Sequence, residues 1–244
     1  MQRKHLERML GLTAALIAHP LVAQDVPYTP TSAYTTNTIR GFTVLVNPEV
    51  YQHGEAHTNA FFRELERQIA DIQRVLPEDK FKALLSVVTW VEWEKKPHGA
   101  AEYHPSAGWL RDNGYNPAKA GGVEINNIRN FVHWSRRTQP AMHLHELSHA
   151  YMFRFVQPGN PTYDALKKAY DNAVKTGIYD TVEFIGGGKK KAYALTDINE
   201  YFAELTETYF LKNDFYPFVR EELEVHDPEG YQILKKIWEE EKRE

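Results

Sequence analysis

Residues 145–149 read His145-Glu146-Leu147-Ser148-His149, and this His-Glu-x-x-His motif is the stretch from which fold and function are inferred. On a helix, positions i and i+4 lie on one face about one turn apart. Two imidazoles there can bind one Zn²⁺ from the same side, with Glu146 beside the metal to take a proton from water. The alternative is a buried helix whose two histidines are satisfied within the core.

The residues around the motif predict that it lies on a helix. Pro140 suits a first helical turn, and no Gly or Pro follows until Pro158-Gly159. The apolar residues recur with helical spacing and predict a core-facing stripe of Leu144, Leu147, Tyr151 and Phe155. His145 and His149 fall on another face, as a metal helix inside a cleft requires. His143 points away from that face and is interpreted as structural.

A zinc hydrolase needs a third protein ligand and an open position for water. The best candidate segment is Asn199-Glu200-Tyr201-Phe202-Ala203-Glu204, in which Glu200 and Glu204 share one helix face. Two other interpretations stay open for these residues. Asp197 and Glu200 fit an N-terminal capping box, and Glu200, Glu204 and Glu207 fit a solvated acidic stripe.

The pattern Asn-Glu-x-x-Ala-Glu resembles the second motif of the gluzincins, the thermolysin-like clan of zinc peptidases. The resemblance implies that Glu200 is the third zinc ligand and that Glu204 steadies a ligand histidine, since such histidines favour a carboxylate on their other nitrogen. Tyr193 precedes Glu200 by seven residues, as in the lethal-factor type and the related clostridial Pro-Pro endopeptidases. That likeness implies that the Tyr193 hydroxyl donates to the oxyanion formed during attack. His226 is the other candidate for this role, although its place before Asp227-Pro228 favours a turn.

The resemblance also extends beyond the motifs. Residues 40–240 resemble a group of uncharacterised secreted bacterial proteins, through stretches such as Asn213-Asp214-Phe215-Tyr216-Pro217-Phe218. In the gluzincin clan, an edge strand beside the zinc helix binds the substrate backbone by adding a strand. The expected strand at 122–125 is either that edge strand or an ordinary internal one.

The N-terminal residues predict export. Arg3, Lys4 and Arg8 precede a short apolar run from Met9 to Val22, and Ala23 is a plausible cleavage residue, so residues 1–23 are interpreted as a signal peptide. The run is shorter than the ~20 residues that span a bilayer, so an uncleaved anchor is the lesser alternative. We therefore expect a secreted or periplasmic protein with no stable membrane insertion after cleavage.

Charge and cysteine content narrow the set of partners. The chain has a net charge of −4, which becomes −6 once residues 1–23, with three basic residues and one acidic residue, are removed. A negative protein is a poor match for nucleic acid as a partner. The expected partner is a peptide or protein substrate, as the zinc-peptidase motifs imply. The chain has no Cys, which excludes disulfides. We expect a monomer, although the sequence carries no direct sign of oligomeric state.

The expected fold class is α+β and zincin-like, with a small mixed sheet lobe, a helical lobe and the active-site helix between them. Residues 24–38 lack periodicity and predict a linker or extended arm. Residues 39–244 are expected to form one catalytic domain, with the sheet lobe at about 39–157 and the helical lobe at about 158–244. Expected strands are 41–46, 85–93 and 122–125, and expected helices are 56–76, 79–86, 162–176, 197–212 and 228–243.

Two stretches between these elements are expected to be loops. Residues 95–120, which are rich in Gly and Pro, predict a long loop, with a surface histidine at His104. Residues 186–191, Gly-Gly-Gly-Lys-Lys-Lys, predict a flexible basic loop.

These features together predict a secreted zinc metallopeptidase, an endopeptidase with Zn²⁺ as its cofactor. His145, His149 and Glu200 would bind the zinc, Glu146 would act as general base, and Tyr193 would steady the oxyanion. One alternative is a non-catalytic binding or structural protein on the same fold. Another is a zinc amidase that acts on cell-wall peptides. The sequence does not indicate which peptide bonds are cleaved.

Overall fold

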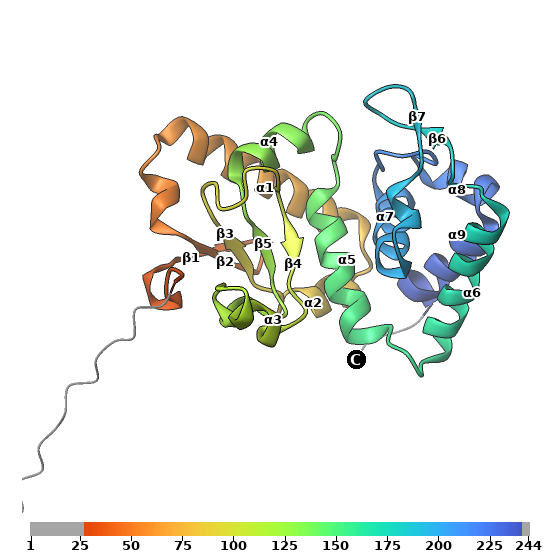
Figure 1. Cartoon of the computed structure of the whole chain (residues 1–244), viewed down its shortest axis with the longest axis horizontal. Coiled ribbons are helices and arrows are strands. Elements are labelled where there is room, and N and C mark those ends of the chain that lie inside the picture. Colours follow the sequence, from red (N-terminus) through yellow and green to blue (C-terminus); the bar gives the residue numbers. More distant parts are fainter. Residues whose placement is uncertain (1–26, 241–244) are drawn as a thin grey trace, which may run out of the picture.

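The computed structural model describes residues 27–240, so the expected signal peptide at 1–23 lies outside the described residues. All strands of the main sheet lie in the first half of the described residues, among several helices, and the second half is mainly helical, so the predicted α+β class is confirmed (Figure 1). Within residues 27–240, no helical segment combines the length and the hydropathy that crossing a bilayer would require.

The main sheet has five strands in the order β1-β2-β3-β5-β4. β2 (Phe42–Val46), β3 (Thr89–Val91) and β5 (Val123–Ile125) run parallel to one another, while β1 (Thr35–Ile39) and β4 (Glu102–Tyr103) pair antiparallel at the two edges. The sheet has both parallel and antiparallel pairs and is mixed, as expected. Alternate residues of β2 are buried, as one packed face requires.

The C-terminal part of the expected linker belongs to the sheet. Residues 35–38 lie in β1 and pair with β2 through a tight hairpin, in which Ile39 opposes Phe42. Arg40 and Gly41 between them both have positive φ, which two-residue hairpin turns favour because their twist matches that of the strands. The sequence predicted a linker or extended arm here, and residues 35–38 form part of an extended edge strand. The strand could not be recognised in the sequence because β1 is mostly exposed and has no apolar alternation.

The expected strand at 122–125 is confirmed as β5, but it is an internal strand. The edge strand next to β5 is β4, which lies inside the stretch predicted to be a loop, as does α3 (Ala107–Asp112). A two-residue strand is too short to show a period-2 pattern, so it escapes detection from sequence. The predicted strand at 85–93 shortens to β3, because α2 (Glu78–Leu84) ends next to Leu85.

Helices pack against this sheet. α1 (Glu55–Val75) buries Phe61, Leu65, Ile69 and Ile72 at helical spacing, confirming the predicted stripe. α1 contacts α2, α5 and α4 (Ile128–Ser135), a helix that was not predicted. The Asn127 side chain caps α4 by accepting hydrogen bonds from the N–H groups of Arg129 and Asn130.

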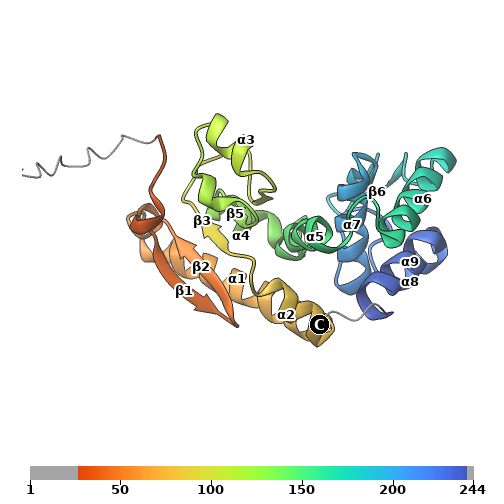
Figure 2. The ribbon, with the colours of Figure 1, turned by 90° about the horizontal axis from the view of Figure 1, so that it is seen from below.

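The motif helix α5 (Met142–Phe155) stands between the sheet and the remaining helices (Figures 1 and 2). Leu144, Leu147 and Tyr151 of the predicted stripe are fully buried. One side of α5 contacts β4 and β5, and another contacts α7 (Ile198–Phe210). The helix is thus held on both sides, which fixes the orientation of its side chains.

The C-terminal region is mainly helical. It comprises α6 (Pro161–Thr176), α7, α8 (Arg220–His226) and α9 (Pro228–Lys235), followed by a π-helical turn, Lys236–Glu240. α7 contacts α6, α8 and α9, and residues 201–209 are buried. Part of the expected flexible loop at 186–191 is ordered, because β7 (Lys189–Lys190) pairs with β6 (Val182–Glu183).

Candidate metal centre

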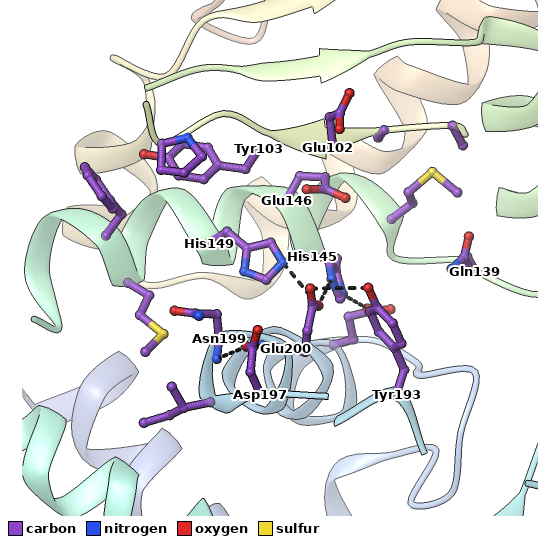
Figure 3. A pocket seen from close by; sticks show the side chains of 18 of the residues that line it. Glu102, Tyr103, Gln139, His145, Glu146, His149, Tyr193, Asp197, Asn199 and Glu200 are labelled. Atoms are coloured by element: carbon purple, nitrogen blue, oxygen red, sulfur yellow. Dashed lines mark hydrogen bonds and ion pairs between the residues drawn. The ribbon is translucent and has the colours of Figure 1, made fainter. Parts of the chain in front are cut away.

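The site lies in a cleft of about 720 Å³ between β4, α5 and α7. β4 and residues 98–101 form one wall, and the N-terminal part of α7 forms the other. His145, Glu146 and His149 project from α5 between these walls; the two histidines face Glu200, and Glu146 lies on the β4 side (Figure 3). Residues 55 positions apart in sequence therefore meet across the cleft.

Two histidines and one carboxylate converge in this cleft. Glu200 Oε2 lies 3.0 Å from His145 Nε2 and 3.4 Å from His149 Nε2. Ligands about 2.0–2.2 Å from a tetrahedral zinc are themselves about 3.3 Å apart, so these separations fit a shared metal ion. The ligand atoms of all three residues lie within 4.8 Å of one another. Nitrogen and carboxylate donors in this number also suit zinc.

The start of α7 explains how Glu200 is positioned. Asp197 is the N-cap, and its carboxylate accepts hydrogen bonds from the N–H groups of Asn199 at 2.7 Å and Glu200 at 3.0 Å. The capping interpretation and the ligand interpretation are therefore compatible, since Asp197 caps the helix while the Glu200 side chain reaches the histidines. Partial burial raises the pKa of Glu200, but hydrogen bonds from His145 and His149 outweigh it and hold that pKa well below its ordinary value.

Three buried carboxylates stand behind His145. His145 Nδ1 lies 2.6 Å from Glu207 Oε1 and 3.6 Å from Glu204 Oε1, so the hydrogen bond goes to Glu207. Burial lowers the pKa of His145, yet hydrogen bonds to Glu200 and Glu207 raise it well above the ordinary value. Burial together with Glu207 and Asp214 raises the pKa of Glu204. The carboxylate that orients His145 is therefore Glu207. The resemblance implied Glu204 for this role, and the sequence pattern indicated Glu207 only as part of a solvated acidic stripe.

Glu146 lies on the β4 side of the histidines. It is only 8% exposed, and Figure 3 shows it between Glu102 and the two imidazoles. Burial raises the pKa of Glu146 above its ordinary value, while the positive charges of His145 and His149 oppose the shift. A carboxylate with a raised pKa at the edge of a donor cluster can both accept and release a proton.

Tyr193 enters the cleft from the short 3₁₀ turn Tyr193–Leu195, just before α7. Its hydroxyl donates to Glu200 Oε1 at 3.3 Å, and its ring lies beside that of His145. Burial and the nearby Glu200 raise the pKa of Tyr193 to about 12, so the phenol keeps its proton at neutral pH. It can therefore act as a hydrogen-bond donor to a group bound in the cleft.

Three other histidines considered in the sequence, His104, His143 and His226, do not line the cleft. His226 lies elsewhere, where its Nε2 donates to the carbonyl of Ile178. His143 is fully buried beside Phe42, and burial lowers its pKa to about 4, in keeping with the structural role expected for it. The expectation of a surface His104 is wrong, since this residue is buried and lies 2.6 Å from Glu124 Oε2.

Comparisons with protein-family models, with curated proteins and with solved structures gave no match to this chain.

Proposed function

We propose that this protein is a zinc-dependent metallopeptidase of the gluzincin type, with a zincin-like fold. The observation that supports the proposal most directly is the convergence of His145, His149 and Glu200 within 4.8 Å in an open cleft. The adjacent Glu146 and Tyr193 supply a proton acceptor and a hydroxyl donor on the same cleft. A site built only for structural metal has no need of either group.

The proposal assigns a task to each residue of the metal centre and to its neighbours. His145, His149 and Glu200 hold the zinc, which when bound lowers the pKa of water and polarises the peptide carbonyl. Glu146 accepts a proton as water attacks the carbonyl carbon and then passes it to the leaving amine. Tyr193 donates its hydroxyl to the carbonyl oxygen as negative charge develops there. Glu207 accepts from His145 Nδ1 and so orients that imidazole.

The free edge of β4 offers a place for the substrate backbone. Asn126 N–H bonds to the Ala100 carbonyl and His104 N–H bonds to the Gly122 carbonyl, so residues 100, 102 and 104 face β5. By the antiparallel pattern, the backbone groups of Ala101 and Tyr103 point to the other side, and both residues line the cleft. An extended peptide can pair with them as an added strand.

Two measurements test the proposal together. Metal analysis of the purified protein should give one zinc per chain, and His149→Ala and Glu200→Ala should each lose most of it. Glu146→Gln should retain zinc and lose roughly 10²-fold or more of peptide hydrolysis, because the amide cannot take the proton. Stoichiometric zinc in either ligand variant would show that other residues bind it.

Substrate tests separate the proposal from its alternatives. A zinc-loaded protein that cleaves no member of a peptide library would favour the non-catalytic binding protein. Cleavage restricted to cell-wall peptides would favour the amidase. Hydrolysis of ordinary peptides that Glu146→Gln abolishes would support the peptidase.

A further inference from the structure

A second hollow, of about 640 Å³, lies beside the sheet, between α1, α4 and the loop after β3. We call it the basic hollow. Its charged lining consists of three arginines, Arg129, Arg136 and Arg137, against one carboxylate, Glu94, with His57 and His133 at its sides. Such an excess of positive charge stands out in a chain with a net charge of −4.

The arrangement of α4 brings these residues together. Arg129, His133 and Arg136 occupy positions i, i+4 and i+7, which share one helix face. Arg136 is the C-cap of α4, and Arg137 is the next residue. All four side chains are exposed. The opposite face of α4 buries Ile128 and Phe131 in the core, so the helix itself is firmly anchored.

The three guanidinium groups have unused donor capacity. Arg129 bonds to Glu94 at 2.7 Å, and Arg136 reaches Glu64 only at 3.5 Å. Within the described part of the chain, Arg137 has no carboxylate at ion-pair distance. Each guanidinium carries five N–H donors in a fork that matches a carboxylate. The hollow can therefore accept further anionic groups.

The basic hollow adjoins one end of the cleft. Pro97 lines the hollow, whereas the next two residues, His98 and Gly99, line the cleft. Asn130 holds this divider by donating from Nδ2 to the carbonyls of Pro97 at 2.9 Å and Gly99 at 2.8 Å. Along α4, His133 likewise faces the hollow and Trp134 the cleft. A peptide that extends out of the cleft at this end can therefore reach the hollow.

The cleft and the hollow differ in charge. Among the described residues that line the cleft there is no Lys or Arg, whereas Glu102, Asp197 and Glu207 all line it. We propose that the basic hollow binds acidic residues of a peptide substrate at positions remote from the bond that is cleaved. This inference rests on the peptidase function proposed above and specifies its substrate class as peptides with an acidic flanking segment.

Direct binding tests this inference without relying on hydrolysis. The Glu146→Gln full-length protein is titrated with fluorescent 12-residue peptides of alternating Glu and Gly, or of alternating Gln and Gly, and anisotropy is followed. The Glu peptide should bind roughly three- to tenfold more tightly, as a few exposed charge pairs allow, and high salt should remove the difference.

Variants locate the effect. Arg129→Gln/Arg137→Gln removes two charges that contact no buried acid, so folding should be unaffected, and the preference for the Glu peptide should be lost. Arg111→Gln removes an exposed arginine on α3 outside the hollow and should leave the preference intact. Equal binding of the two peptides, or equal losses in both variants, would overturn the inference. Tighter binding of an oligonucleotide of equal charge would reassign the hollow to nucleic acid.

The two proposals fail separately. If the wild-type protein cleaves peptides but an acidic flanking segment does not improve their binding, only the proposed role of the basic hollow is wrong. If no peptide is cleaved while the Arg129→Gln/Arg137→Gln variant still loses acidic-peptide binding, the catalytic proposal fails and the anionic site stands.

Discussion

Tyr193 offers the sharpest test at the scale of single residues. Its hydroxyl lies 3.3 Å from Glu200 Oε1, and the Tyr193 side chain lines the cleft. Tyr193→Phe should lower kcat by roughly 10²-fold with little change in KM, as removal of one oxyanion donor does. Zinc content and thermal stability should stay normal, because the ring remains. Steady-state kinetics with near-normal kcat would exclude an oxyanion role, and loss of zinc would indicate a structural one.

Glu207 and Glu204 form a matched pair for a second test. Glu207 lies 2.6 Å from His145 Nδ1, whereas Glu204 lies at 3.6 Å. Glu207→Gln should weaken zinc binding by about 10- to 100-fold, as loss of a carboxylate behind a ligand histidine does. Glu204→Gln should have a clearly smaller effect. Competition with a chromophoric chelator measures both affinities, and equal losses would contradict the assignment of Glu207 as the orienting group.

At the scale of elements, β4 is the strand whose position matters most. Ala101 directs its N–H away from β5, so a proline there removes a free donor and leaves the β4–β5 hydrogen bonds in place. Ala101→Pro should lower kcat/KM for peptides by about three- to tenfold, the value of one hydrogen bond. Ala101→Gly keeps the N–H and should retain activity. An unchanged kcat/KM in the proline variant would remove β4 from substrate binding.

At the scale of the whole molecule, a buried charge network joins the N-terminal segment to the sheet. Lys119 is 1% exposed, and its Nζ bonds to Glu92 and to Glu124, each at 2.5 Å. Glu92 also accepts from Tyr34, and Glu124 faces His104. Burial opposes ionisation of Glu124, but His104 and Lys119 outweigh it and lower the pKa of Glu124 to about 2.

This network predicts a pH-dependent stability. A carboxylate with a lowered folded-state pKa stabilises the fold above its ordinary pKa of 4.5, and this contribution is lost as pH falls toward 2. Lys119→Met leaves two buried carboxylates and should cost about 3–5 kcal/mol at neutral pH. The cost should shrink near about pH 3, where the unpaired buried carboxylates of the variant take up protons.

Urea unfolding at the two pH values measures the effect. Lys82→Met replaces a lysine that is 65% exposed and should change stability by less than about 0.5 kcal/mol. A Lys119→Met cost that is the same at both pH values would show that charge burial is not its cause.

Local chemistry made much of this protein predictable. The run from Pro140 to Val156 has one apolar stripe and no helix breaker, so α5 and the shared face of His145 and His149 follow from helix geometry alone. The helix α1 also follows from periodicity, α6 and α7 lie close to where helices were expected, and the α+β class follows from the order of the expected strands and helices. These properties depend on neighbours within a few turns, which a sequence displays directly.

Long-range packing determined the rest. Glu207 orients His145 only because α7 packs against α5, and nothing in the spacing of three glutamates separates it from Glu204. β4 is an edge strand only because residues 102–103 pair with β5, an alignment that a two-residue segment cannot encode by periodicity. His104, which was expected at the surface, is buried by packing around the sheet, and so is Lys119. Such contacts join positions far apart in the chain, and local sequence patterns carry no record of them.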